Sequence, residues 1–274
     1  MATTTTQARS RAARDATDAL EAVFGVLQPI VKATRELFAG SPPGPDDLRT
    51  VDAPAIEALE QLDDIIVGAG FVAAPDALAG AGHWLQWWSD YEIPRTHVPQ
   101  QLFVDVDPAS ESFNDYTRLP WYEVPARTHN RHVAGPYVDY LCTDQYTLTF
   151  TVPITGSRAF LGVVGADVYA ATMETATYPI LAGLEEPAAL LNASARVVTA
   201  AGCSRTVGDI LRSTEVDTAL RQVTQHRDGV LDLGHSWLKR CSDLPMVVVV
   251  GDLVADPSQP AQQGEDLPTG RRPS

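Results

Sequence analysis

The feature that most constrains the fold of this chain is a regular alternation of residue types within residues 140–153. Aromatic and large apolar residues stand at Tyr146, Leu148, Phe150 and Val152, and threonines stand at Thr147, Thr149 and Thr151. Successive side chains of a strand point to opposite faces, so this alternation predicts a strand with one face against a core. Residues 159–167 are apolar almost throughout and predict a central strand, and residues 168–181 predict a helix. The expected unit is an antiparallel sheet that leads into a helix.

Amphipathic helices are predicted before this sheet. In residues 15–38 the apolar side chains recur at spacings of three and four, at Leu20, Val23, Leu27, Ile30 and Leu37. Pro29 lies inside this helix and is expected to kink it, because its ring removes a backbone donor. Residues 40–45 are glycine, serine and proline and end the helix. A second helix is expected over residues 54–66.

Aromatic and acidic side chains gather between Asp115 and Asp167. The candidates for one binding pocket are Trp121, Tyr122, Tyr137, Asp139 and Asp167. Ring faces attract an ammonium group and carboxylates accept its hydrogens, so this combination points to an organic cation. Each ring alone is also explained as a core residue. Asp167 alone is also explained as the N-cap of the following helix.

The tryptophans add one more candidate. The run from His83 to Ser89 contains three of the five tryptophans, and residues 101–107 alternate in the manner of a strand. If the run is extended, Trp87 and Trp88 face opposite ways. We choose Trp88 as the one that lines the pocket.

The order of these residues resembles the double Cache (dCache) family of extracytoplasmic ligand sensors. Trp121-Tyr122 comes first, then Tyr137-x-Asp139, then a strand pair, then Gly162-Val-Val-Gly-Ala-Asp167 before a helix. The resemblance spans about residues 85–215. It implies an α+β fold in which a long N-terminal helix precedes two PAS-like antiparallel sheet modules, with the pocket in the first.

The resemblance also implies roles for single residues. In the amino-acid-binding branch of the family, an arginine two residues before the tryptophan clamps the ligand carboxylate, and an aspartate at the position of Asp167 takes the ammonium group. Leu119 stands at the clamp position here, and Arg118 comes one step early. In an extended segment this offset turns a side chain to the opposite face. The sequence therefore favours an organic amine as the ligand, with an amino acid as the alternative.

We divide the chain into five parts. These are a disordered start (1–14), N-terminal helices (15–67), a ligand-binding PAS-like module (68–182), a second, smaller PAS-like module (183–254) and a disordered tail (255–274). The second module carries expected strands over 189–192, 195–199, 229–233 and 246–250 and a helix over 216–223. The tail is rich in proline, glutamine and glycine, which cannot build a core.

Composition excludes several classes of partner. The net charge of −15 argues against nucleic acid and anionic membranes, which need clustered Lys and Arg. The three cysteines lack metal or disulfide spacing. The sequence offers neither an apolar run of about 20 residues nor an apolar signal segment, so we expect a cytoplasmic protein without membrane contact. The first helix either pairs with its twin in a homodimer or packs on its own domain. A ligand-bound form would act on another protein, such as a regulator.

An enzyme is the rival class. The nucleophile elbow, the phosphate loop, the dinucleotide fingerprint and the His-Glu-x-x-His motif are absent from the sequence. Asp105 and Asp107 with Asp139 suggest a divalent-cation site or an acid–base pair, which keeps a metal-dependent enzyme as the less favoured alternative. Four histidines, at positions 83, 97, 129 and 132, lack the helical spacing of metal ligands and are expected at the surface. We predict no cofactor, no metal and no catalytic residue.

Overall fold

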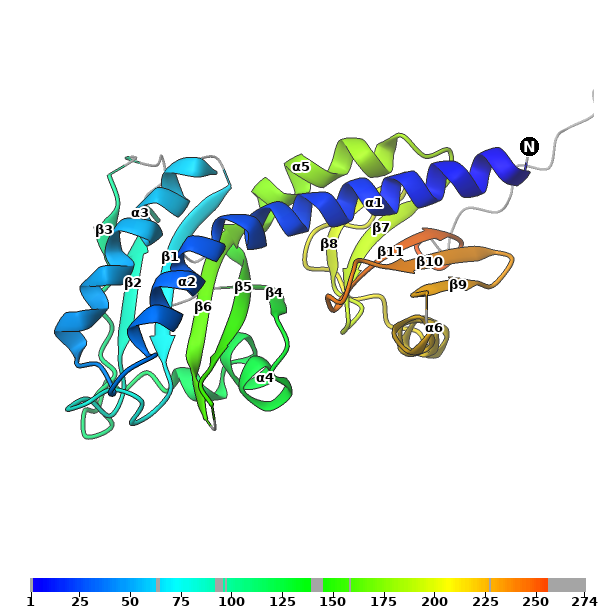
Figure 1. Ribbon diagram of the computed structural model, residues 1–274. Helices are drawn as coiled ribbons and strands as arrows, with labels where there is room; N and C mark the ends of the chain where they lie inside the picture. The colour runs from blue at the N-terminus through cyan, green and yellow to red at the C-terminus, as the bar shows by residue number, and fades with distance from the viewer. Residues whose placement is uncertain are drawn as a thin grey trace, which may run out of the picture.

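The computed structural model of the chain describes residues 2–62, 65–91, 96, 98–138, 145–157, 159–226 and 228–255. Within these ranges the protein is α+β, with a long N-terminal helix followed by two antiparallel sheets (Figure 1). The helices are α1 (Ala2–Val26), α2 (Gln28–Leu37), α3 (Asp52–Gln61), α4 (Pro120–Thr128), α5 (Ala170–Ala182) and α6 (Thr214–Gln225), with 3-10 turns η1 (Pro45–Val51) and η2 (Tyr116–Arg118).

The first sheet has the strand order β3-β2-β1-β6-β5-β4, and the second has the order β8-β7-β11-β10-β9. The strands of the first are β1 (Ile66–Ala73), β2 (Leu85–Ser89), β3 (Gln100–Gln101), β4 (His132–Val138), β5 (Tyr146–Thr155) and β6 (Phe160–Tyr169). The strands of the second are β7 (Ala188–Asn192), β8 (Val197–Ala201), β9 (Val230–Asp232), β10 (Ser236–Arg240) and β11 (Met246–Gly251).

The two faces of the first sheet carry different side chains. Helices α1, α2 and α3 cover one face, where Phe150 and Val164 are fully buried. The opposite face, toward α4, carries Thr149 and Asp167. The alternation predicted for residues 140–153 is therefore confirmed where the structure describes it, and it divides a helix-covered core from a polar face.

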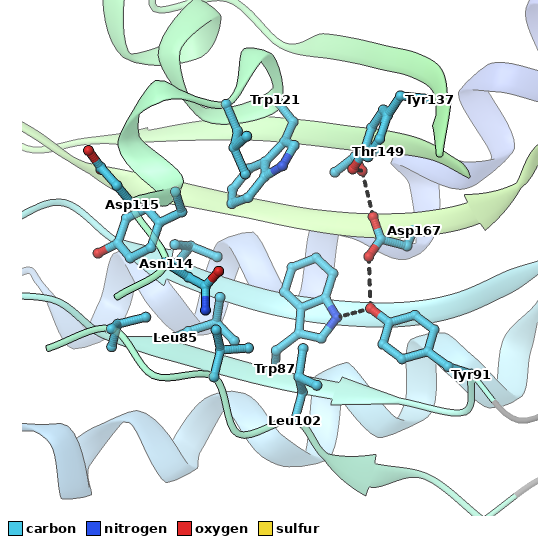
Figure 2. Close-up of a pocket in the computed structure, with 15 residues that line it drawn as sticks. Leu85, Trp87, Tyr91, Leu102, Asn114, Asp115, Trp121, Tyr137, Thr149 and Asp167 are labelled. Atoms are coloured by element: carbon cyan, nitrogen blue, oxygen red, sulfur yellow. Dashed lines mark hydrogen bonds between the residues drawn. The ribbon is translucent and has the colours of Figure 1, made fainter. Parts of the chain in front are cut away.

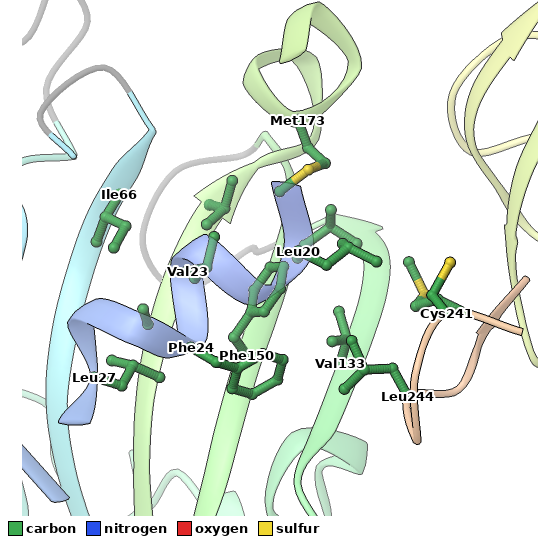
Figure 3. Packing of buried hydrophobic residues seen from close by; sticks show 14 of the residues in the cluster. Leu20, Val23, Phe24, Leu27, Ile66, Val133, Phe150, Met173, Cys241 and Leu244 are labelled. Atoms are coloured by element: carbon green, nitrogen blue, oxygen red, sulfur yellow. The ribbon is translucent and has the colours of Figure 1, made fainter. Parts of the chain in front are cut away.

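Helix α1 packs along both modules. It contacts β5 of the first sheet, β10 and β11 of the second, and helix α5 between them. At 1.5 Å per residue its 25 residues extend over about 37 Å. Figure 3 shows Leu20, Val23 and Phe24 inside the core that the two modules share, with the Phe24 ring 5.3 Å from that of Phe150. None of the helices in the described ranges combines the length and the apolarity needed to cross a bilayer.

An arginine joins α1 to both modules. Arg131 precedes β4, and its Nη1 and Nη2 atoms each lie 2.6 Å from a carboxylate oxygen of Glu21 in α1. Its Nε atom donates to Asp243 at 2.9 Å, in the turn before β11, and its guanidinium lies over the Phe24 ring. A half-buried arginine paired with two carboxylates ties the three segments together more firmly than a single exposed ion pair.

The N-terminal prediction needs correction. Residues 1–14 were expected to be disordered, but α1 begins at Ala2. The reason is tertiary contact: Arg9 Nε donates to Glu186 at 2.9 Å, and Ala13 is buried in the shared core. The kink expected at Pro29 is a break, because α2 starts anew with this proline in its first turn. Of the expected tail, 255–274, only residue 255 lies within the described residues.

Some predicted strands and helices are also wrong. The helix expected over 54–66 ends at Gln61, and Ile66 opens strand β1, which glycines had hidden. Of the strand expected over 101–107 only residue 101 pairs, as part of β3. The expected extended segment around Trp121 is helix α4, which starts at Pro120 because proline suits the first helical position.

Candidate ligand-binding site

A cavity of about 200 Å³ opens on the face of the first sheet opposite α1–α3 (Figure 2). Strands β1, β2, β5 and β6 form its floor, and the segments 102–106 and 114–121 cover it. Its lining consists of Val72, Leu85, Trp87, Tyr91, Leu102, Val104, Val106, Asn114, Asp115, Tyr116, Leu119, Trp121, Tyr137, Thr149 and Asp167. The walls are mostly apolar and aromatic, with a few polar groups, as in small-molecule sites generally.

Glycines in the floor make room for Trp87. A Cβ atom on Gly70 would lie 2.8 Å from the Cα atom of Trp87, and one on Gly68 would lie 2.7 Å from its Nε1 atom. A Cβ atom on Gly165 would lie 3.3 Å from the far edge of the same ring. The indole can therefore lie against the sheet only because these positions lack side chains.

Asp167 is the acidic centre of one end of the cavity. The Tyr91 hydroxyl donates to its Oδ2 atom at 2.8 Å, and the Thr149 hydroxyl donates to its Oδ1 atom at 2.6 Å. The network extends outward, because Trp87 Nε1 donates to the Tyr91 hydroxyl at 2.9 Å and the Tyr137 hydroxyl lies 2.7 Å from that of Thr149 (Figure 2). Asp167 is only 7% exposed. These hydroxyls fix the direction of both carboxylate oxygens.

The N-cap interpretation of Asp167 is wrong. Asp167 lies inside β6, opposite Thr149 of β5 and Gly68 of β1, and Tyr169 precedes α5. Its carboxylate is thus free of a capping role. Its oxygens accept the Tyr91 and Thr149 hydroxyls inside the cavity instead.

A second carboxylate, Asp115, marks the other end of the cavity (Figure 2). The Thr117 hydroxyl donates to it and holds the pKa of Asp115 below its ordinary value. Arg118 Nε lies 2.9 Å from its Oδ2 atom. Next to it, the Tyr116 hydroxyl donates to the Ala73 carbonyl at 2.8 Å, and burial raises the pKa of Tyr116 to about 12. This end of the cavity is already neutralised at its rim.

Arg118 points to solvent, with its side chain 86% exposed. The direction agrees with the prediction, but the expected cause, an extended segment, is wrong. Arg118 is the last residue of turn η2, and its pairing with Asp115 holds it at the rim.

The cover of the cavity is an extended segment rather than a paired strand. Leu102, Val104 and Val106 face the cavity, while Phe103 between them is 83% exposed. The segment is tied to β2 by the hydrogen bond from Leu102 N to Trp87 O, at 2.8 Å. The alternation that predicted a strand here thus reflects a cover with one apolar side.

The structure brings Trp121, Tyr137 and Asp167 to the same cavity, and their contact with a ligand stays a prediction. Asp139 lies outside the described residues. Tyr122 is buried beneath the cavity wall, 3% exposed, with its ring between those of Tyr116 and Phe160 at 5.2 and 5.5 Å. Burial raises the pKa of Tyr122. Tyr122 is therefore a core residue of this site.

The choice of Trp88 is wrong. Trp88 faces α3, where its Nε1 atom donates to Asp52 at 2.9 Å, and Trp87 lines the cavity instead. The sequence reasoning also missed Tyr91 and Thr149. The glycines were the available signal: Gly165 and Asp167 share a face of one strand, and the tryptophan that packs on glycine must lie there too.

The acidic pair that suggested a metal enzyme lies away from the cavity. Asp105 and Asp107 sit in an exposed turn, where Asp105 accepts from Asp107 N at 3.1 Å and from the Ser110 hydroxyl, which lowers the pKa of Asp105. Within the part of the chain that the structure describes, His, Cys, Asp and Glu form no group of three or more that could hold a metal ion.

Comparison with known proteins shows that the first module is similar to sensor domains. Residues 82–175 match the family described as methyl-accepting chemotaxis protein-like, first PDC sensor domain. No curated protein matches the chain. Among solved structures, the chain is similar to the extracellular domain of mmHK1S-Z3, described as a histidine kinase, with a TM-score of 0.60 and 14% identity over 87% of this chain and 89% of that one.

Two chemoreceptor structures are similar as well. Methyl-accepting chemotaxis protein X matches with a TM-score of 0.59 and 16% identity over 92% of this chain and 98% of that one. The sensory domain of the Campylobacter jejuni chemoreceptor Tlp3, with isoleucine bound, matches with a TM-score of 0.52 and 10% identity over 91% of each chain. Identities this low establish the fold alone. The first module thus matches a sensor-domain family, and the chain as a whole has the double-module fold of these solved structures.

Proposed function

We propose that the cavity of the first module binds a small organic cation and that Asp167 holds its ammonium group. The observation that carries this proposal is a carboxylate only 7% exposed whose oxygens are oriented by the Tyr91 and Thr149 hydroxyls. Burial of a carboxylate becomes less costly as donors and positive charge gather around it. A ligand ammonium would add a positive charge and further donors to the hydroxyls of Tyr91 and Thr149.

The aromatic walls support the same ligand. Trp87 and Trp121 lie on two sides of the space beside Asp167 (Figure 2). An ammonium group within about 6 Å of an aromatic ring gains about 0.5–2 kcal/mol, more when water is excluded. A volume of about 200 Å³ equals the liquid share of ~7 water molecules, so the ligand has the size of a small metabolite.

An amine without a carboxylate fits the charge of the cavity better than an amino acid does. Among the lining residues that the structure describes, the charged groups are the carboxylates of Asp115 and Asp167. Asp115 is paired with Arg118 at the rim, so a ligand carboxylate inside the cavity would be repelled mainly by Asp167. Arg118, the nearest arginine in the sequence to the family's clamp position, is exposed and paired with Asp115.

An α-amino acid is the second candidate. The Tlp3 sensory domain, which shares the fold, was solved with isoleucine bound. Arg118 would then have to leave Asp115 and turn inward over the rim. The two candidates share the ammonium site at Asp167 and differ in the role of Arg118.

Three matched ligands separate the candidates by calorimetry. Isoleucine carries both charged groups, 2-methylbutylamine keeps its side chain and ammonium, and 3-methylpentanoate keeps its side chain and carboxylate. We expect the amine to bind at least tenfold more tightly than isoleucine, 3-methylpentanoate to bind more weakly than both, and Arg118→Ala to change amine binding little. Tight isoleucine binding that Arg118→Ala abolishes would establish the amino-acid candidate instead.

A further inference from the structure

A second concave surface, which we call the inter-module groove, lies between the two modules. It encloses about 410 Å³, with Trp121 and His132 on the side of the first module and Asn192, Arg196 and Pro245 on the side of the second. Trp121 and Tyr137 also line the cavity of the first module. The two spaces are therefore neighbours that share part of a wall.

Arg196 gives the groove a positive charge. Its Nη1 atom donates to the Gly208 carbonyl at 2.7 Å, which anchors the half-buried side chain. In the part of the chain that the structure describes, no carboxylate lies within ion-pair distance of Arg196. A guanidinium has five N–H donors, so one bond to Gly208 leaves most of them for another partner. In a chain with a net charge of −15, an arginine in a concavity without a carboxylate stands out.

His132 is the second polar group of the groove. It was expected at the surface, but it is half-buried at the start of β4, and burial lowers the pKa of His132 to about 4. At neutral pH its ring is uncharged and offers one donor and one acceptor. The groove thus combines a cation and a neutral hydrogen-bonding ring with the apolar surfaces of Trp121, Pro136 and Pro245.

The Asn192 side chain ties the two sides of the groove together by hydrogen bonds to backbone groups. Asn192 Nδ2 donates to the Gly135 carbonyl at 2.7 Å, and its Oδ1 atom accepts from Ser194 N and Arg196 N, each at 2.9 Å. Asn192 therefore fixes the turn that presents Arg196 to the first module. The bond to Gly208 is enough to hold the Arg196 side chain in place, so it assigns no role to the remaining N–H groups of the guanidinium.

We propose that the inter-module groove binds a small organic carboxylate. The carboxylate accepts two N–H donors of Arg196, in the fork geometry that a guanidinium offers to planar anions, and His132 donates from the other side. The apolar part of the molecule lies against Trp121 and the two prolines. This site has the opposite charge from the cavity at Asp167, so it selects anions where that cavity selects cations.

Calorimetric titration of the full chain with benzoate and with benzamide, its neutral analogue, tests the site. We expect saturable benzoate binding at least tenfold tighter than benzamide binding. Arg196→Gln should weaken benzoate binding at least tenfold, and Arg212→Gln, an arginine of the same module outside the groove, should leave it unchanged. Asp167→Asn should also leave it unchanged, which separates this result from the fate of the amine proposal.

A second variant guards against a folding artefact. Ser194 is exposed at the rim, so Ser194→Glu should keep the thermal unfolding midpoint while its carboxylate competes for Arg196 and weakens benzoate binding at least tenfold. The proposal is overturned if benzoate, hexanoate and succinate all fail to bind saturably. It is overturned equally if benzoate binding survives both Arg196→Gln and Ser194→Glu, or if Asp167→Asn abolishes it.

Discussion

Each module contains its own antiparallel sheet, but one face of the sheet is covered differently in the two modules. In the first, glycines and the small polar Thr149 leave space above the sheet, and an extended segment and α4 close it into a cavity. In the second, helix α6 lies on the sheet and packs Leu220 and Val223 against Leu191 and Val249. One architecture therefore becomes a binding module or a packing module according to the side chains on a single face.

The largest effect is expected where the glycine floor is filled. A Cβ atom at Gly70 would lie 2.1 Å from the Gln86 carbonyl oxygen, so the backbone of β2 must move. Gly70→Ala should lower the free energy of unfolding by about 3 kcal/mol and remove ligand binding. The control is Gly25→Ala in α1, where a Cβ atom meets nothing within 4 Å. That change should raise stability by about 0.5–1 kcal/mol, and equal unfolding curves for the two variants would contradict the role of the floor.

A pair of leucine truncations tests the difference between the packed face of the second module and the cavity face of the first. Leu220 is 4% exposed in the packed face of the second module, whereas Leu102 borders the existing cavity. Leu220→Ala should cost about 2–5 kcal/mol because it opens a new void. Leu102→Ala should cost less than about 1.5 kcal/mol because its cavity side is already open. Denaturant unfolding measures both, and a larger loss for Leu102→Ala would reverse the assignment of the two faces.

A smaller effect is expected at the boundary between the modules. Burial lowers the pKa of His132 from about 6.5 to about 4, so the folded state favours the neutral ring. The contribution of His132 is complete above pH 6.5 and is lost as the pH falls toward 4, by at most about 1.4 kcal/mol per pH unit. His132→Gln should flatten the stability profile over this range. A slope of the stability profile that His132→Gln leaves unchanged would show that other groups cause it.

The sequence predicted the structure correctly where a residue pattern is compatible with a single local structure. The threonine alternation in β5 and the order from Trp121 to Asp167 predicted the sheet, its polar face and three of the cavity residues. The choice between Trp87 and Trp88 failed because an extended segment gives two faces without saying which one meets the cavity. The pairing of Trp87 with Gly70 decides this, and pairing is a tertiary property.

Helical geometry explains the misplacement of Tyr122. Consecutive side chains of a helix point about 100° apart, and in α4 this directs Trp121 to the cavity and Tyr122 into the core. Pro120 at the first helical position was the local signal for this helix. The cover over residues 102–106 could not be predicted from alternation, because a strand and a one-sided cover have the same pattern.

The most direct test of the account is the binding of 2-methylbutylamine to Asp167→Asn, measured by calorimetry beside the wild type and Asp115→Asn. Asparagine keeps the size of the side chain and its acceptor for the Thr149 hydroxyl but removes the charge. The account predicts that Asp167→Asn stays folded and loses about 2–5 kcal/mol of binding free energy. Arg118 already balances the charge of Asp115 at the rim, so Asp115→Asn should lose less than about 1 kcal/mol. Binding that survives Asp167→Asn unchanged would contradict the central claim that Asp167 holds the ammonium group.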